Sequence, residues 1–182
     1  MKILAATLVC AALATQAFAE VPARLGEWAA HKNLAIGSFV LEKEIPDIGV
    51  SARSAGTFRF EKSKGLFWQN ISPEKFAFFA NESYFEITTH EGSKKSSLEN
   101  FGIKDAASLL FKGDFSDFEK KFKIEVLEEG KDKISIKLTP KISKIKNGLD
   151  FAVITFAGNS AESCVLHLAN ETLIKITFKE TL

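Results

Sequence analysis

The sequence predicts a mainly β fold (α+β) in which about ten short strands form one antiparallel sheet. One observation is an apolar–polar alternation with a period of two, which is typical of strands with one solvated face. It is clear where Phe58 and Phe60 alternate with Arg59 and Glu61. The other is that short turns join the strand-like segments, which requires neighbouring strands to be antiparallel. A sheet of this many strands from so short a chain must curl strongly or close.

The same alternation predicts strands along most of the chain. The clearest repeat is Ile134, Ile136 and Leu138 on one face with Ser135 and Lys137 on the other. The expected strands cover residues 58–61, 66–69, 76–80, 84–88, 124–126, 134–138, 151–156, 163–169 and 173–179. Turn residues lie between them, at 81–83, 129–132, 158–159 and 170–171.

Three amphipathic helices are expected, over residues 22–34, 105–113 and 114–121. Pro22 suits a first helical turn, Asp105 can cap the second helix, and Gly113 can end it. These helices are available to cover the opening of the curled sheet. Part of the apolar inner surface could then enclose a cavity instead of packing solid.

Residues 1–19 predict export through a cleaved signal peptide. Lys2 precedes an apolar run, and residues 17–19 (Ala-Phe-Ala) supply the small-x-small cleavage pattern. The alternative of a membrane anchor is disfavoured because the run is shorter than the roughly 20 residues that span a bilayer. Cys10 lacks the small residue that precedes the cysteine of a lipoprotein signal. We therefore expect residues 20–182 to form a single domain in the periplasm.

Charge and cysteine content exclude several classes of protein. The chain has 24 Lys+Arg and 23 Asp+Glu, and removal of Lys2 with the signal leaves 23 of each. A neutral chain has no bulk attraction for nucleic acid. Cys164 would remain as the lone cysteine, so no intrachain disulfide is expected. Alternation places its side chain with Leu166 on the apolar side, where the thiol should be inert.

No catalytic or metal-binding pattern is found. His31, His90 and His167 lack zinc-ligand spacing, and there is no G-x-S-x-G elbow or glycine-rich phosphate loop. Cys164 would need a histidine to activate it, and His167 should lie on the opposite face of the strand. We expect no enzyme activity, no cofactor and no metal.

The middle of the chain resembles the LolA family of periplasmic outer-membrane lipoprotein carriers. The resemblance lies in residues 54–60 (SAGTFRF), in 64–69 (KGLFWQ), which contain Trp68, and in 137–141 (KLTPK). It implies a half-open antiparallel β-barrel with a helical lid over a hydrophobic cavity that accepts lipoprotein acyl chains. It also implies an inner-membrane releasing complex and an outer-membrane receptor as partners of a monomeric carrier.

The sequence departs from the family pattern at two places. Both bear on how the lid is controlled and on the direction in which cargo is handed over. Lys62 stands at a turn position where well-known members carry Arg, whose two-pronged guanidinium Lys lacks. The chain also ends at Leu182, where longer members continue.

The candidate lipid-contacting residues are mostly aromatic. They are Phe58, Phe60, Trp68, Phe76 and Phe78 on strands, and Leu110 and Phe118 on the lid helices, with Lys62 as a polar contact to the lid or ligand. Each has an alternative: the aromatics as ordinary core, Trp68 as closure of one barrel end, and Lys62 as a solvated turn residue. An A+T-rich genome would also enrich Phe.

The predicted function is a periplasmic carrier that shields lipoprotein acyl chains on the way from the inner to the outer membrane. A carrier of a non-protein lipid or glycolipid with the same fold is the first alternative. A ligand-free structural or assembly factor is the second.

Overall fold

The computed structural model describes residues 33–81, 83–97, 119–158 and 160–181. These residues form 11 strands in one sheet, a short helix and a 3-10 turn, and residues 119–121 are also helical. The elements are β1 (Leu34–Ile45), η1 (Pro46–Ile48), β2 (Val50–Glu61), β3 (Gly65–Ser72), β4 (Phe76–Ala80), β5 (Tyr84–Thr89), β6 (Gly92–Ser97), β7 (Phe122–Glu129), β8 (Lys133–Pro140), α4 (Ser143–Lys146), β9 (Leu149–Ala157), β10 (Ser160–Leu168) and β11 (Leu173–Glu180).

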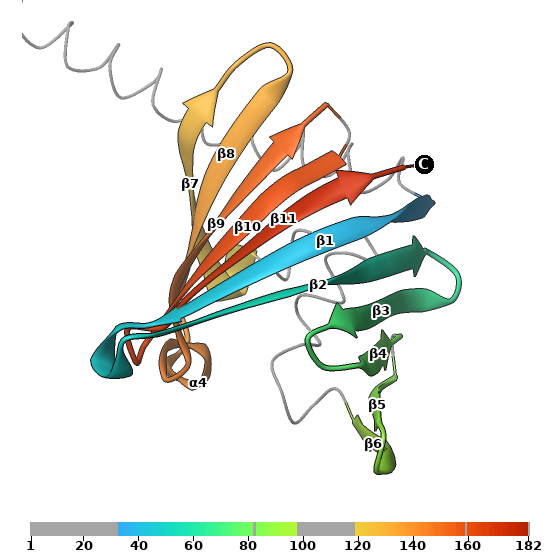
Figure 1. Ribbon diagram of the computed structural model, residues 1–182. Coiled ribbons are helices and arrows are strands. Elements are labelled where there is room, and N and C mark those ends of the chain that lie inside the picture. Colours follow the sequence, from blue (N-terminus) through green and yellow to red (C-terminus); the bar gives the residue numbers. More distant parts are fainter. Residues whose placement is uncertain (1–32, 82, 98–118, 159, 182) are drawn as a thin grey trace, which may run out of the picture.

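The sheet consists of two meanders that meet where the first strand pairs with the last. The strand order is β6-β5-β4-β3-β2-β1-β11-β10-β9-β8-β7, and every described pairing is antiparallel. Figure 1 shows β1 and β11 side by side in the middle of the curved sheet. β6 and β7 are its two edges, so the predicted barrel is an open sheet.

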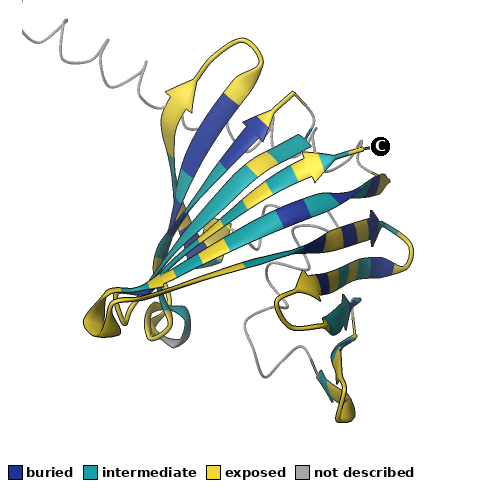
Figure 2. Ribbon diagram, in the orientation of Figure 1, coloured by how far each residue is buried: buried dark blue, intermediate teal, exposed yellow. Residues whose placement is uncertain are grey.

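The strand register divides the sheet into two faces. Directly opposed residues of antiparallel strands point to the same side. Phe39 of β1 opposes Phe178 on one side and Gly56 on the other, and Trp68 opposes Phe58. We call the side that carries these residues the inner face, and its reverse the outer face. Figure 2 shows the alternation along β2, where buried and exposed bands follow one another.

Buried side chains of the inner face gather into two clusters. The aromatic half contains buried Ala35, Phe39, Phe58, Phe60, Ala80 and Phe85, with Leu41, Leu66, Trp68, Phe78, Ile176 and Phe178 packed against them. The aliphatic half contains buried Phe122, Ile134, Ile136, Leu138, Ala152 and Phe156, with Ile124, Ile145, Leu149, Ile154, Ala161 and Leu166 packed against them. α4 contributes Ile145 to the aliphatic half.

The described strands confirm the mainly β prediction and correct several details. Each predicted strand lies within an observed one, apart from Ala169, which lies in the turn after β10. β1, β6 and α4 are additions to the prediction. The predicted first helix ends too late, because Leu34 begins β1.

The lid falls mostly outside the described residues. Residues 22–32 and 105–118, with Leu110 and Phe118, lie there, as do the predicted signal at 1–19 and His31. Of the third predicted helix, residues 119–121 are described and helical. The claim of about three lid helices therefore stays a prediction. No helix within the described part is long and apolar enough to cross a membrane.

Candidate lipid-binding face

Two glycines make room for aromatic rings on the inner face. Gly56 opposes Phe39, and a Cβ there would overlap the Gln69 carbonyl oxygen and lie 2.7 Å from the Phe39 ring. Gly37 opposes Phe58, and a Cβ there would lie 2.9 Å from the Phe58 ring. A glycine inside a strand thus marks a close approach by a neighbouring group. Here the neighbour is an aromatic ring from the adjacent strand.

The rings above these glycines contact one another across four strands. The Phe39 and Trp68 ring centroids are 3.6 Å apart in a stacked arrangement. Phe178 meets Phe58 edge-on at 5.6 Å and Trp68 edge-on at 6.3 Å. The two edge-on contacts have a geometry that aromatic pairs favour. The cluster therefore joins β1, β2, β3 and β11.

The structure brings the strand residues of the predicted site together. Phe58 and Phe60 are buried at 8% and 7% exposure. Trp68, Phe76 and Phe78 are half-buried on the same inner face, with Trp68 opposite Phe78. The two buried rings are core residues of the sheet, whereas the three half-buried rings keep apolar surface that a ligand could cover.

Three aromatics of the cluster were absent from the predicted site. These are Phe39, Phe85 and Phe178. Their signal was present in the sequence, because Ile176 and Phe178 alternate with charged or polar residues just as Phe58 and Phe60 do. Period-two alternation assigns residues to a face within one strand only, so for Phe85 and Phe178 the missing information was how the strands pair. β1, which carries Phe39, was not among the predicted strands.

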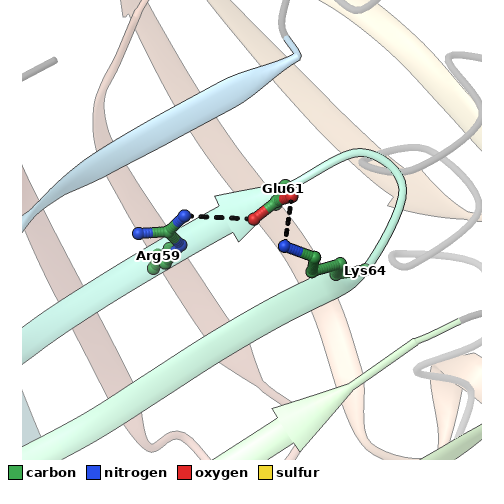
Figure 3. A network of polar contacts seen from close by, with 3 residues as sticks. All are labelled: Arg59, Glu61 and Lys64. Atoms are coloured by element: carbon green, nitrogen blue, oxygen red, sulfur yellow. Dashed lines mark hydrogen bonds and ion pairs between the residues drawn. The ribbon is translucent and has the colours of Figure 1, made fainter.

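Lys62 lies in the β2–β3 hairpin, where its backbone N–H donates to the Asn33 carbonyl at 2.9 Å. The ion pairs of this hairpin involve its neighbours instead. The Glu61 carboxylate accepts from Lys64 at 2.8 Å and from Arg59 at 3.1 Å (Figure 3). Lys64 and then Arg59 lower the pKa of Glu61 through these hydrogen bonds. Within the described residues the Lys62 side chain has no hydrogen bond or ion pair.

The outer face carries a second, smaller aromatic strip over β3 to β6. The Phe67 and Phe79 centroids are 4.6 Å apart, and Phe79 lies 5.6 Å from Tyr84. The Lys95 ammonium sits 3.4 Å from the centre of the Tyr84 ring. Phe67 is 51% exposed. Because this strip lies on the opposite side of the sheet, it is separate from the candidate lipid-binding face.

The Cys164 and His167 side chains lie on opposite faces of β10, as predicted. Cys164 opposes Ile176 on the inner face, and its burial raises the thiol pKa to about 11. His167 stacks on Phe151 at 3.9 Å on the outer face. In the described ranges, no three His, Cys, Asp or Glu residues gather into a possible metal site.

Comparisons with known proteins find structural neighbours in the LolA superfamily. The sequence matches no family profile and no curated protein. A LolA superfamily protein from Nitrosomonas europaea is similar, with 8% identity and a TM-score of 0.48 over 86% of this chain and 90% of that one. A Vibrio parahaemolyticus domain, described as an outer membrane lipoprotein-sorting protein domain, has 11% identity and a TM-score of 0.42 over 90% of both chains.

MucB from Pseudomonas aeruginosa, in complex with MucA, is another neighbour. It has 13% identity and a TM-score of 0.46, and the match covers 85% of this chain but 55% of that one. At these identities and TM-scores the similarity concerns the course of the chain and says nothing about a cargo.

Proposed function

We propose that this protein is a periplasmic carrier that shields the acyl chains of lipoproteins and takes them from the inner to the outer membrane. The observation that supports it is the set of half-buried aromatics on the inner face, Trp68, Phe76 and Phe78. Each CH₂ group that leaves water gains about 0.8 kcal/mol. A face of this kind can hold an acyl chain without covalent chemistry, so the proposal requires no catalytic residue or cofactor.

The proposed route runs between two membranes. Residues 1–19 would direct export to the periplasm, and an inner-membrane releasing complex and an outer-membrane receptor would load and unload a monomeric carrier. The near-equal numbers of acidic and basic residues fit a cargo recognised by apolar contact and no nucleic acid partner.

The first experiment identifies the cargo. The mature protein is purified from its own periplasm, and the co-purifying molecules are analysed by mass spectrometry. Triacylated lipoprotein would support the proposal, and a free lipid or glycolipid would favour a carrier of non-protein lipid. No bound species, together with no uptake of a fluorescent fatty acid, would contradict both carrier functions.

A protein partner without lipid cargo is the second candidate function. The outer aromatic strip favours it, since the half-exposed Phe67 ring lies beside Phe79. Aromatic residues are enriched at protein interfaces. An assembly factor of this kind would depend on Phe67 and would retain its activity after changes to Trp68.

A tryptophan exchange tests which face contacts the acyl chain. Trp68 and Phe67 are adjacent on β3 and point to opposite faces. In a Trp28→Phe background, a bromine-labelled fatty acid should quench the Trp68 fluorescence. The double variant Trp68→Phe with Phe67→Trp moves the fluorophore to the outer face and should lose the quenching. Equal quenching in both proteins would contradict a binding face on the inner side.

The proposal also includes a helical lid over the opening of the sheet. Leu110 and Phe118 would lie across the opening of the sheet and exchange their apolar contacts for those of an incoming acyl chain. Leu110→Ser or Phe118→Ser should then reduce lipid retention while the β-sheet circular dichroism stays unchanged. A global loss of stability without a selective loss of lipid binding would contradict the lid.

A further inference from the structure

Lys43 interrupts the apolar inner face near one end of β1. Lys43 lies on the same side of β1 as Phe39 and Leu41. Its cross-strand neighbours are Ala52 on β2 and Ile174 on β11. The register continues this row through residues that are all apolar: Leu166, Ala152, Leu138 and Ile124. Lys43 is therefore the single charged residue in a row that crosses seven strands.

The Lys43 side chain is half-buried and has no partner among the described residues. It makes no hydrogen bond and no ion pair there. The neighbouring acids Glu42 and Glu44 alternate to the outer face, where Glu42 lies 3.9 Å from Arg53. The inner-face acid Glu180 lies six residues beyond Ile174 on β11, which is about 20 Å. Within the described part of the chain, no carboxylate lies within ion-pair distance of this ammonium group.

Apolar side chains connect Lys43 with the aromatic half. Leu41 lies between Lys43 and Phe39 along the strand and packs against the aromatic cluster. Ile176 does the same on β11, between Ile174 and Phe178. Lys43 lies four positions along the strand from Phe39, about 13 Å away. The inner face therefore has an apolar surface with a cation at one end.

We propose that the Lys43 ammonium binds the phosphate of an anionic phospholipid whose acyl chain lies on the aromatic half. This inference rests on the proposed function for the acyl chain on the inner face, and it adds a phospholipid to lipoprotein as a ligand of that face. An amphiphile with a charged phosphate at one end of an apolar tail matches the order of charge and apolar surface on β1. Lysine is a common phosphate ligand that acts as a compact point charge.

The test compares two probes that share an acyl chain and differ in headgroup charge. Palmitoyl-lysophosphatidylglycerol carries the phosphate, and monopalmitoylglycerol does not. Both are titrated into the mature protein at monomeric concentrations, with affinity read from tryptophan fluorescence. The wild-type protein should bind the phosphate probe about tenfold more tightly, as one charge-assisted hydrogen bond would give. Added salt should reduce that preference.

Two matched variants separate a specific contact from a general charge effect. Lys43→Gln should remove the tenfold preference and leave the affinity for monopalmitoylglycerol unchanged. Lys175→Gln removes an exposed lysine one position beyond Ile174, on the outer face of β11, and should retain the preference. Thermal unfolding of both variants checks that the sheet is intact.

Each remaining outcome contradicts a different claim. Equal affinity for the two probes, or an unchanged preference in Lys43→Gln, overturns the headgroup site while acyl binding stands. Absence of binding by both probes overturns the proposed function and the headgroup site together. Tighter Lys43-dependent binding of palmitate than of the phosphate probe would make the occupant a fatty acid and overturn the phospholipid assignment.

Discussion

The aromatic and aliphatic halves of the inner face use the same sheet in different ways. In the aliphatic half, Ile134, Ile136 and Leu138 of β8 are all buried, at 8% exposure or less. The outer side of this strand is also closed, because Ser135 and Thr155 are buried and share a hydrogen bond of 3.0 Å. In the aromatic half, Trp68 and Phe78 remain half-buried beside the buried Phe39 and Phe58.

The difference assigns stability mainly to one half and ligand contact mainly to the other. The branched side chains of β8 fill space closely, and the apolar surface that the aliphatic half keeps belongs to half-buried neighbours such as Ile154 and Leu166. In the aromatic half the rings above Gly56 and Gly37, Phe39 and Phe58, are buried. The half-buried Trp68 and Phe78 beside them keep apolar surface that a chain of CH₂ groups can cover. The comparison predicts that core changes in the aliphatic half lower stability alone, whereas changes at half-buried rings of the aromatic half lower lipid binding.

Removal of a core side chain from the aliphatic half should have the largest effect on stability. Ile136 is 2% exposed in the middle of β8. Ile136→Ala should lower the free energy of unfolding by about 2–5 kcal/mol, through lost burial and the cavity left behind. Denaturant unfolding measures the change. Fatty-acid affinity of the folded variant should match wild type, and a marked loss of affinity would show that the halves are not separate in function.

Gly56, in the aromatic half, should tolerate no side chain. Gly56→Ala places a methyl group against the Gln69 carbonyl and the Phe39 ring. The strain should lower the free energy of unfolding by about 1–3 kcal/mol. Gly130→Ala is the control, since its Cβ would meet its nearest neighbour, the Lys133 carbonyl oxygen, at an ordinary 3.6 Å. Equal stabilities of these two variants in denaturant would mean that Phe39 does not need Gly56.

Two adjacent phenylalanines on β4 can distinguish the loss of a ligand contact from a general loss of hydrophobic surface. Phe78 and Phe79 are both half-buried, and they point to the inner and outer face respectively. Phe78→Ala should weaken fatty-acid binding about tenfold, which corresponds to about 1.4 kcal/mol. Phe79→Ala should retain wild-type affinity. A titration that finds the larger loss in Phe79→Ala would move the binding site to the outer strip.

The smallest effect is expected at Cys164 and at alkaline pH. Burial raises its pKa from 9.0 to about 11. Above pH 9 the unfolded thiol ionises while the folded one stays protonated, so the unfolding free energy falls as pH rises. At pH 10 the loss is about 1 kcal/mol. Denaturant titrations at pH 8 and pH 10 should show this loss in wild type relative to Cys164→Ala. Rapid labelling of the native thiol at pH 8 would contradict the burial.

The apolar–polar alternation within single segments predicted most of the strands, because it distinguishes the two faces of a strand without any information from the rest of the chain. Phe58 and Phe60 on one side of β2, and Ile134, Ile136 and Leu138 on one side of β8, followed from period two alone. Two strands, β1 and β6, were not predicted. The residues of β6, Gly92 to Ser97, are polar or glycine throughout and carry no alternation. The polarity of β6 suits an edge strand, since lysine-rich edges discourage pairing with other chains.

The sequence by itself determined which side chains share a face within each strand, and through this the apolar character of one side of the sheet. Short turns also made consecutive strands neighbours, and tertiary structure alone decided how the two meanders join. β1 pairs with β11, and this brings Phe39 and Phe178 together and sets Lys43 beside Ile174. The physical reason is that alternation fixes only the face on which each side chain of a strand lies. It does not specify which strand pairs with it. Contacts such as that of Phe39 with Gly56 select the neighbouring strand. Such contacts form only when several strands pair in the correct register.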